Sequence, residues 1–247
     1  MQRRTKTMNK ILISICFLAS LNIQAQQFLR EGTIEFECKV SIHKIMKEES
    51  PEWYERMKDK TPKFDVHYNN LLFNDSQSLF VEGREPDVKT RSFWYGTSNE
   101  NYIFHDFNKQ SHVASKQVYE ERFLLNDSAR KIVWKLTNDT RNIAGYECKK
   151  AVGLMFDTVY IIAFYCDKII CPSGPESITG LPGMILGAAI PRIYTSWFAT
   201  KVDLTPLKEG SIKIPTKGKK IAFKDLQIKL TETFKEWGKS MVLRSLI

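Results

Sequence analysis

The chain has 247 residues, of which 43% are hydrophobic and 26% are charged, and its formal net charge is +9. Four of the positive charges lie in the first ten residues, and the others are scattered, with the densest cluster at 217–220. A short basic run of this kind is typical of a solvated surface, so the composition gives no support to nucleic-acid binding. The length suits one domain with one core, and no low-complexity linker divides it.

The N-terminal segment has the pattern of an export signal. Four basic residues open it: Arg3, Arg4, Lys6 and Lys10. An apolar run over 11–23 follows, and Ala25 ends a small-residue cleavage site. This run, like every later one, is shorter than the roughly 18–20 apolar residues that span a bilayer. We therefore predict a signal peptide over 1–25 and a mature domain over 26–247, without a transmembrane segment, in the periplasm or outside the cell.

The first part of the mature chain predicts a strand and then a short helix. Apolar residues alternate with polar ones from Ile34 to Ile42, which indicates a half-buried strand with Cys38 facing inward. Ser50, Pro51 and Glu52 supply a cap, a first-turn proline and an early acid, so a helix is expected from Ser50 to about Met57.

The rest of the chain predicts a meander of strands separated by polar turns. The expected strands cover 64–69, 78–82, 91–95, 101–107, 111–125, 131–136, 146–155, 158–166 and 193–202. The stretch 159–165 is apolar on both faces, which favours a central position in the sheet.

A C-terminal helix completes the predicted set of elements. Asp225 can cap a helix with one apolar stripe, which ends at Gly238 and is made of Leu226, Leu230, Phe234 and Trp237. The expected fold is mainly β in a single domain, with an antiparallel curved sheet or open barrel, or a sandwich as the alternative. A short N-terminal helix and the C-terminal helix accompany the sheet.

Aromatic residues could line a concave face of such a sheet or fill its core, and filling the core is their commoner role. The set consists of Phe93, Trp94, Tyr95, Tyr102, Phe104, Trp134, Phe164, Trp197 and Phe198.

Four cysteines remain in the mature chain, and an even number in an exported protein favours disulfides. Cys166 and Cys171 are the easiest to connect because the four residues between them can form a turn. A zinc site would need two further ligands. We predict a Cys166–Cys171 disulfide and leave the pairing of Cys38 and Cys148 open.

Two histidines are candidates for a metal site. If Asn108-Lys109 is a two-residue hairpin turn, His105 and His112 lie directly opposite each other, with Cβ atoms about 5 Å apart. Spacing supplies no third ligand, so the alternative is two exposed histidines on a solvated face. The sequence contains no G-x-S-x-G, H-E-x-x-H, C-x-x-C or phosphate-loop motif. No cofactor is expected.

A glycine-rich stretch without reactive side chains is the most distinctive part of the sequence. Leu181-Pro182-Gly183-Met184 fits a type II turn, with proline at the second position and glycine at the third. Met184, Ile185 and Leu186 then form a short apolar strand, and Gly180 and Gly187 bracket the unit. We expect a pinned loop that enters the core, and we take Gly180, Leu181, Pro182, Gly183, Met184, Ile185 and Leu186 as the candidate site for a ligand or partner.

The motif at 180–186 resembles the signature of the GLPGLI family, exported proteins of Bacteroidetes, with Met184 where the family name has leucine. The blocks W-K-L-T-N at 134–138 and I-A-G-Y-E-C-K-K-A at 143–151, and the pair Gly174-Pro175, are similar to the family pattern in the same order. The segment 166–171 departs from it. The resemblance covers about residues 60–205 and implies export and a β-rich fold, but it brings no activity, substrate or catalytic residue.

Three functional hypotheses follow. The favoured one is a non-enzymatic envelope protein that binds an apolar small molecule, a peptide or a partner protein through the motif. The second is a metal protein or enzyme built around His105 and His112, with Asp106 or Glu120 as further candidates. The third is a purely structural envelope protein.

Overall fold

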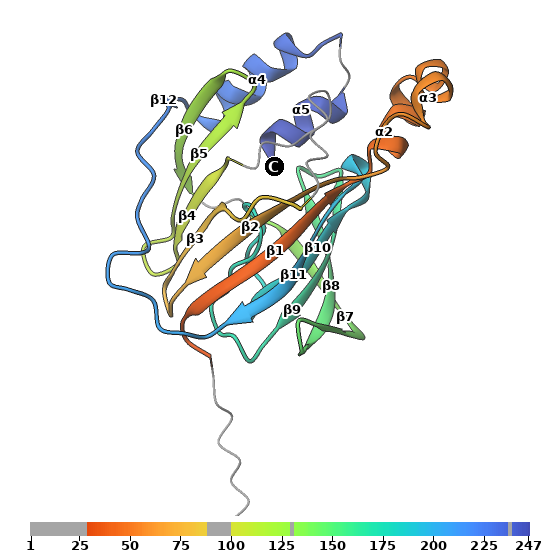
Figure 1. Ribbon diagram of the computed structural model, residues 1–247. Coiled ribbons are helices and arrows are strands. Elements are labelled where there is room, and N and C mark those ends of the chain that lie inside the picture. Colours follow the sequence, from red (N-terminus) through yellow and green to blue (C-terminus); the bar gives the residue numbers. More distant parts are fainter. Residues whose placement is uncertain (1–28, 88–99, 129–130, 237–238) are drawn as a thin grey trace, which may run out of the picture.

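The computed structural model describes residues 29–87, 100–128, 131–236 and 239–247. Within these residues twelve strands form one open, curved sheet in the order β12-β6-β5-β4-β3-β2-β1-β11-β10-β9-β8-β7 (Figure 1). Neighbouring strands are antiparallel, except that β12 is parallel to β6. The predicted mainly β fold with a curved antiparallel sheet is confirmed, and the sheet does not close into a barrel.

The strands have the following bounds: β1 Gly32–Val40, β2 Asp65–Phe73, β3 Gln77–Glu82, β4 Tyr102–Asp106, β5 Ser111–Val118, β6 Glu121–Ser128, β7 Val133–Ile143, β8 Tyr146–Met155, β9 Val159–Cys166, β10 Met184–Ile190, β11 Thr195–Asp203 and β12 Lys219–Lys220. The helices are α2 Ile42–Glu49, α3 Pro51–Met57, α4 Phe223–Thr233 and α5 Lys239–Leu246, and a short 3₁₀ turn covers Pro191–Ile193.

The sheet has two halves joined by its first strand. β1 pairs with β2 on one side and with β11 on the other, so β2 to β6 form one half and β7 to β11 the other. The helices α2 and α3 continue from the end of β1, and α4 lies close to β5 and β6 (Figure 1). Among the described residues, no helix has the length and apolar character needed to cross a membrane.

The N-terminal strand and the helix after Ser50 are present as predicted, but a further helix, α2, which the sequence analysis did not predict, lies between them. The alternating side chains of β1 are buried as predicted, but the strand ends at Val40 and Ile42 begins α2. In that helix Ile42, Ile45 and Met46 are buried, which is the spacing of one helix face. The expected helix after Ser50 is present as α3, starting at Pro51.

Other boundaries also differ from prediction. The single strand expected over 111–125 is two strands, β5 and β6, joined by a turn at which Tyr119 has a positive φ of 53°. The strand expected over 131–136 continues to Ile143 as β7. The C-terminal helix is capped at Ala222 instead of Asp225, which lies in its first turn.

Parts of the prediction fall outside the described residues. These are the signal segment 1–25, the strand 91–95 with its three aromatic residues, and Trp237 and Gly238. The remaining members of the apolar stripe, Leu226, Leu230 and Phe234, are buried as expected.

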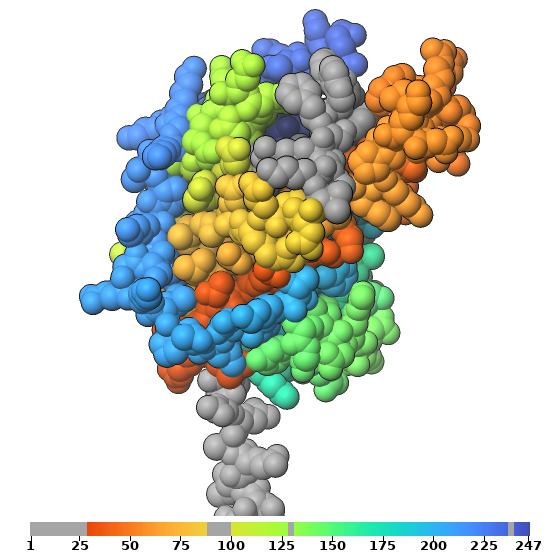
Figure 2. Space-filling model, in the orientation of Figure 1, coloured from red at the N-terminus to blue at the C-terminus, as the bar shows by residue number. Residues whose placement is uncertain are grey.

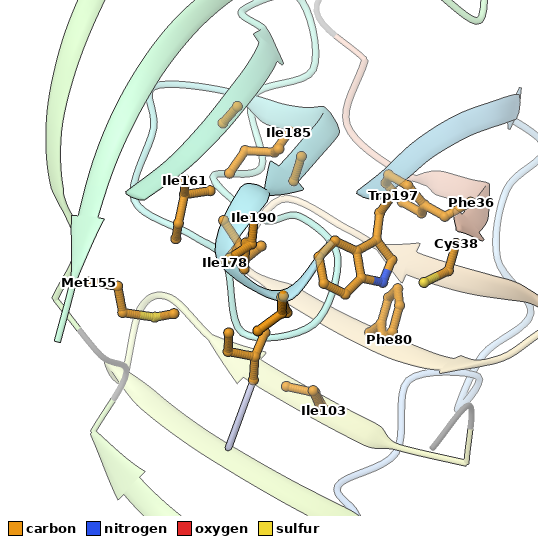
Figure 3. Packing of buried hydrophobic residues seen from close by; sticks show 14 of the residues in the cluster. Phe36, Cys38, Phe80, Ile103, Met155, Ile161, Ile178, Ile185, Ile190 and Trp197 are labelled. Atoms are coloured by element: carbon orange, nitrogen blue, oxygen red, sulfur yellow. The ribbon is translucent and has the colours of Figure 1, made fainter. Parts of the chain in front are cut away.

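The core fills the concave side of the sheet. The connection from β9 to β10 turns back into this space, and we call its residues 171–183 the inserted segment. Figure 3 shows Ile178 of this segment close to Ile190 and Ile185 of β10, beside Ile161 of β9. The chain therefore closes the inside of its own curved sheet with a segment rich in glycine and proline.

Candidate functional site

The glycine-rich motif forms a tighter turn than predicted. The Gly183 N–H donates to the Leu181 carbonyl at 2.8 Å, whereas the Met184 N–H donates to the Ile169 carbonyl at 2.9 Å. The bond from Gly183 to Leu181 closes a three-residue turn centred on Pro182, and the φ of Gly183 is far from the roughly +80° of a type II turn, so the type II assignment is wrong. Gly183 has φ of +151°, and a Cβ there would lie 2.3 Å from the Cys166 carbonyl oxygen. Glycine is required at this position because two backbones approach each other closely.

Most of the candidate binding residues are enclosed by the protein itself. Met184, Ile185 and Leu186 are fully buried in β10, between β9 and β11, and Leu181 is buried beside them. Only Gly180 and Pro182 are exposed. The motif is therefore mainly part of the core, and a molecule in solution can contact only Gly180 and Pro182.

Trp134 on β7 holds the inserted segment against the sheet. Its Nε1 donates to the Thr179 carbonyl at 3.0 Å. Its ring covers Gly153 of β8, where a Cβ would be 2.6 Å from the indole, and lies 3.5 Å from the Cβ position of Gly180. Trp134 and Gly180, which are far apart in the sequence, therefore lie against each other in the fold.

A buried ion pair connects the inserted segment to the opposite half of the sheet. Glu176 and Lys116 of β5 are 3% and 2% exposed, with Oε2 and Nζ 3.9 Å apart. Asn101 donates to both carboxylate oxygens, at 3.4 and 3.2 Å. Burial raises the pKa of Glu176, and the charge of Lys116 and the hydrogen bond from Asn101 oppose that rise.

The two histidines face each other across β4 and β5, as the sequence predicts. The register pairs His105 with His112, and their ring centroids are 4.7 Å apart. Both are buried, so the expectation of exposed histidines on a solvated face is wrong: these strand positions face the filled concave side. Within the described residues the ring nitrogens of His105 have no hydrogen-bond partner, and burial lowers its pKa to about 4.

Two further polar contacts fasten the inserted segment, and both involve serines. Ser173 and Ser78 of β3 have their Oγ atoms 2.7 Å apart, and Ser177 Oγ lies 3.2 Å from His112 Nε2. In the part of the chain that the structure describes, no group of three His, Cys, Asp or Glu side chains is placed to hold a metal. Ser173 and Ser177 therefore add polar contacts between the inserted segment and the sheet.

The four cysteines are free, buried thiols. The predicted Cys166–Cys171 disulfide is not formed in this structure. Burial raises the pKa of both thiols, and backbone N–H groups of residues 168 and 169 near Cys166, and of residue 173 near Cys171, oppose that rise.

The outer face of the sheet near β7 is apolar. The register places Val133 of β7, Leu154 of β8 and Tyr160 of β9 in one row across the strands. Val133 is 66% exposed and Tyr160 is 63% exposed. The adjacent row contains Val152 and Ile162, both half-buried, and at β7 it begins with the exposed Lys135. We call the five apolar residues of these two rows the outer apolar face. The stretch 159–165 is apolar on both sides, from which we predict a central position; β9 does lie between β8 and β10, but Tyr160 on one of its faces is exposed to solvent.

The outer apolar face adjoins an open sheet edge. β7 is the last strand in the sheet and, within the described residues, pairs only with β8. Its register shifts between Leu136 and Thr140, which divides the strand into two regularly paired halves, and the half from Val133 to Leu136 is the one beside the outer apolar face. Bulges are one way in which proteins limit pairing at an edge, and here the bulge spares that half.

The aromatic residues divide between core and surface. Phe104 and Trp197 are fully buried, and Figure 3 shows Trp197 beside Phe36, Cys38 and Phe80. Trp134, Phe164 and Phe198 are half-buried, and Tyr102 is exposed. Arg141 lies over Phe198 and Phe164, with its guanidinium carbon 4.6 and 5.6 Å from the ring centroids.

Comparison of the sequence with protein-family models and with curated proteins finds no match. Among solved structures the chain is similar to PNGF-II in two crystal forms. In the C2 form the TM-score is 0.50 at 15% identity, with 87% of this chain and 33% of PNGF-II covered. In the P21 form the TM-score is 0.51 at 16% identity, with 85% and 34% covered. The chain thus spans about a third of PNGF-II. At this identity the likeness concerns the β-rich fold alone.

Proposed function

We propose that the protein is exported and binds, without catalysis, an extended apolar segment of a partner protein in the cell envelope. The observation that carries this proposal is that β9 is apolar on both faces while its outer face is open to solvent. A sheet with one solvated face normally alternates between apolar and polar residues, so an apolar outer face indicates a surface that becomes covered.

The open edge of β7 suits an extended partner. A peptide that adds to this edge would pair with the main chain between Val133 and Leu136, and its alternate side chains would lie on the outer apolar face. Main-chain hydrogen bonds would supply affinity, and contacts with Tyr160 and Val133 would supply specificity. No cofactor or nucleic acid is needed for this mode of binding.

An apolar small molecule is a weaker candidate than a peptide. A ligand held against Met184, Ile185 and Leu186 would have to displace the packed interior, because these side chains are fully buried. The purely structural alternative leaves the outer apolar face without a role. The family resemblance to GLPGLI proteins remains a prediction that agrees with export.

Site-specific photo-crosslinking in cells of the source organism tests the proposal. A photoreactive amino acid at Tyr160 or Val133 should give the same defined adduct. The control position is Ile228, an apolar residue on α4 that is 52% exposed. In Figure 2 the dark blue surface near the C-terminus lies at the top, apart from the green surface of β7 and β8. All three side chains are exposed, so the substitutions should change stability by less than about 0.5 kcal/mol. Equal crosslinking at Ile228, or none at either sheet position, would contradict the proposal.

A further inference from the structure

Two cysteines from separate parts of the sequence lie opposite each other on adjacent strands. The register pairs Lys149 with Tyr165 and Lys150 with Phe164. The printed pairs end at Lys149 and Tyr165; continued by one position, the same register would place Cys148 of β8 opposite Cys166, the last residue of β9. Directly opposed residues of antiparallel strands share one face and have Cα atoms about 4.5–5.5 Å apart, inside the range of about 4.4–6.8 Å that disulfides require.

Neighbouring contacts agree with this extension of the register. Lys149 Nζ and Asp167 Oδ2 form an ion pair at 2.6 Å across the same two strands. Burial raises the pKa of Cys148 to about 12, and the nearby Cys166 thiol is the next cause. Cys166 also contributes to the raised pKa of Tyr146, after burial. Both thiols are fully buried, so the pair lies inside the packed protein.

We propose that Cys148 and Cys166 form a disulfide that staples β8 to β9 as this hairpin folds. The two thiols lose two protons and two electrons to a disulfide oxidant, such as oxidised glutathione or an envelope thiol oxidoreductase, which leaves as two thiols. The oxidant meets the thiols before they are enclosed, because the folded protein gives it no access to them. In the cell the bond rests on the proposed export, which supplies the oxidising compartment.

The disulfide would stabilise β9, the strand that carries Tyr160 of the outer apolar face. β9 presents Tyr160 outward and pairs with β10, which carries the glycine-rich motif. A cross-link that closes a loop of roughly 15–20 residues should raise the thermal midpoint of a domain of this size by roughly 6–12 °C.

Peptide mapping decides between the pairings without any substitution. The purified protein is unfolded, reduced and refolded with reduced and oxidised glutathione, and remaining thiols are alkylated before digestion. Trypsin separates the cysteines into the peptides 31–39, 142–149, 151–168 and 169–192. The proposal predicts a linked pair of 142–149 with 151–168. The same map on protein isolated without reductant from the periplasm of an expressing bacterium gives a reading that does not depend on refolding.

Two variants sharpen the result. Cys171→Ala should keep the linked pair and the higher thermal midpoint, whereas Cys148→Ala should lose both. Linkage of 151–168 with 169–192 in the unsubstituted protein, or four alkylated thiols in both preparations, would overturn the disulfide. These outcomes leave the crosslinking at Tyr160 unaffected, so the disulfide and the proposed function can fail separately.

Discussion

The buried pair of Lys116 and Glu176 gives a quantitative test of how the inserted segment is held. The atoms are 3.9 Å apart, and both side chains are almost fully enclosed. At an effective dielectric constant of about 20, this separation corresponds to about 4 kcal/mol of attraction. Lys116→Met removes that attraction and leaves the Glu176 carboxylate buried beside Asn101, so unfolding should become easier by about 3–5 kcal/mol.

Urea denaturation of Lys116→Met, Glu176→Gln and the double variant measures the effect. The double variant should be more stable than Lys116→Met by at least about 2 kcal/mol, because it contains no unpaired carboxylate. Lys201→Met is the matched control, since Lys201 pairs with Asp203 at an exposed site and should matter by less than about 1 kcal/mol.

The pH dependence of Lys116→Met follows from the raised pKa of Glu176. Loss of Lys116 favours the neutral carboxyl group further, and a raised carboxyl pKa means that stability is lost as pH rises through it. The variant should therefore be more destabilised at pH 8 than at pH 5. If Lys116→Met lies within 1 kcal/mol of the unsubstituted protein, or if the double variant is no better, the ion pair does not hold the segment.

Three further predictions concern the interior. The pKa of His105 falls from 6.5 to about 4 on burial. About 3 kcal/mol of the free energy of unfolding should therefore be lost as pH falls from about 6.5 to 4. His105→Phe should remove this loss, which urea titrations at the two pH values would measure. Gly183→Ala and Gly183→Asn should lower the thermal midpoint equally, because any Cβ meets the Cys166 carbonyl. The control Gly210→Ala should lower it less, since a Cβ there meets nothing within 4 Å. A clearly smaller effect of Gly183→Asn than of Gly183→Ala would support the type II turn instead. Trp134→Phe should lower stability by about 1–2 kcal/mol through its lost hydrogen bond to the inserted segment, and an unchanged denaturation midpoint would count against that role.

The strands of the meander could be predicted because their period is local. The alternation of apolar and polar residues located β1. The turn at Asn108-Lys109 gave the register that pairs His105 with His112. Alternation failed at Ile42, which continues the apolar rhythm of the strand and also starts the apolar face of α2. A short segment cannot separate these two periods, so the boundary depended on packing.

The site depended on contacts between distant parts of the chain. Glu176 lies in a Gly-Pro-Glu-Ser stretch that is typical of an exposed turn, and only Lys116 and Asn101 explain its burial. The outer apolar face did have a local signal in 159–165. That signal alone does not show whether the second apolar side meets other parts of the chain or solvent.

The most direct test of the account compares crosslinking at two positions in cells. Tyr160 represents the outer apolar face, and Pro182 represents the exposed end of the glycine-rich motif. We predict a defined partner adduct from Tyr160 and none from Pro182, because the other residues of the motif are packed in the core. An adduct from Pro182 without one from Tyr160 would contradict binding at the outer apolar face and would indicate that the partner binds at the glycine-rich motif.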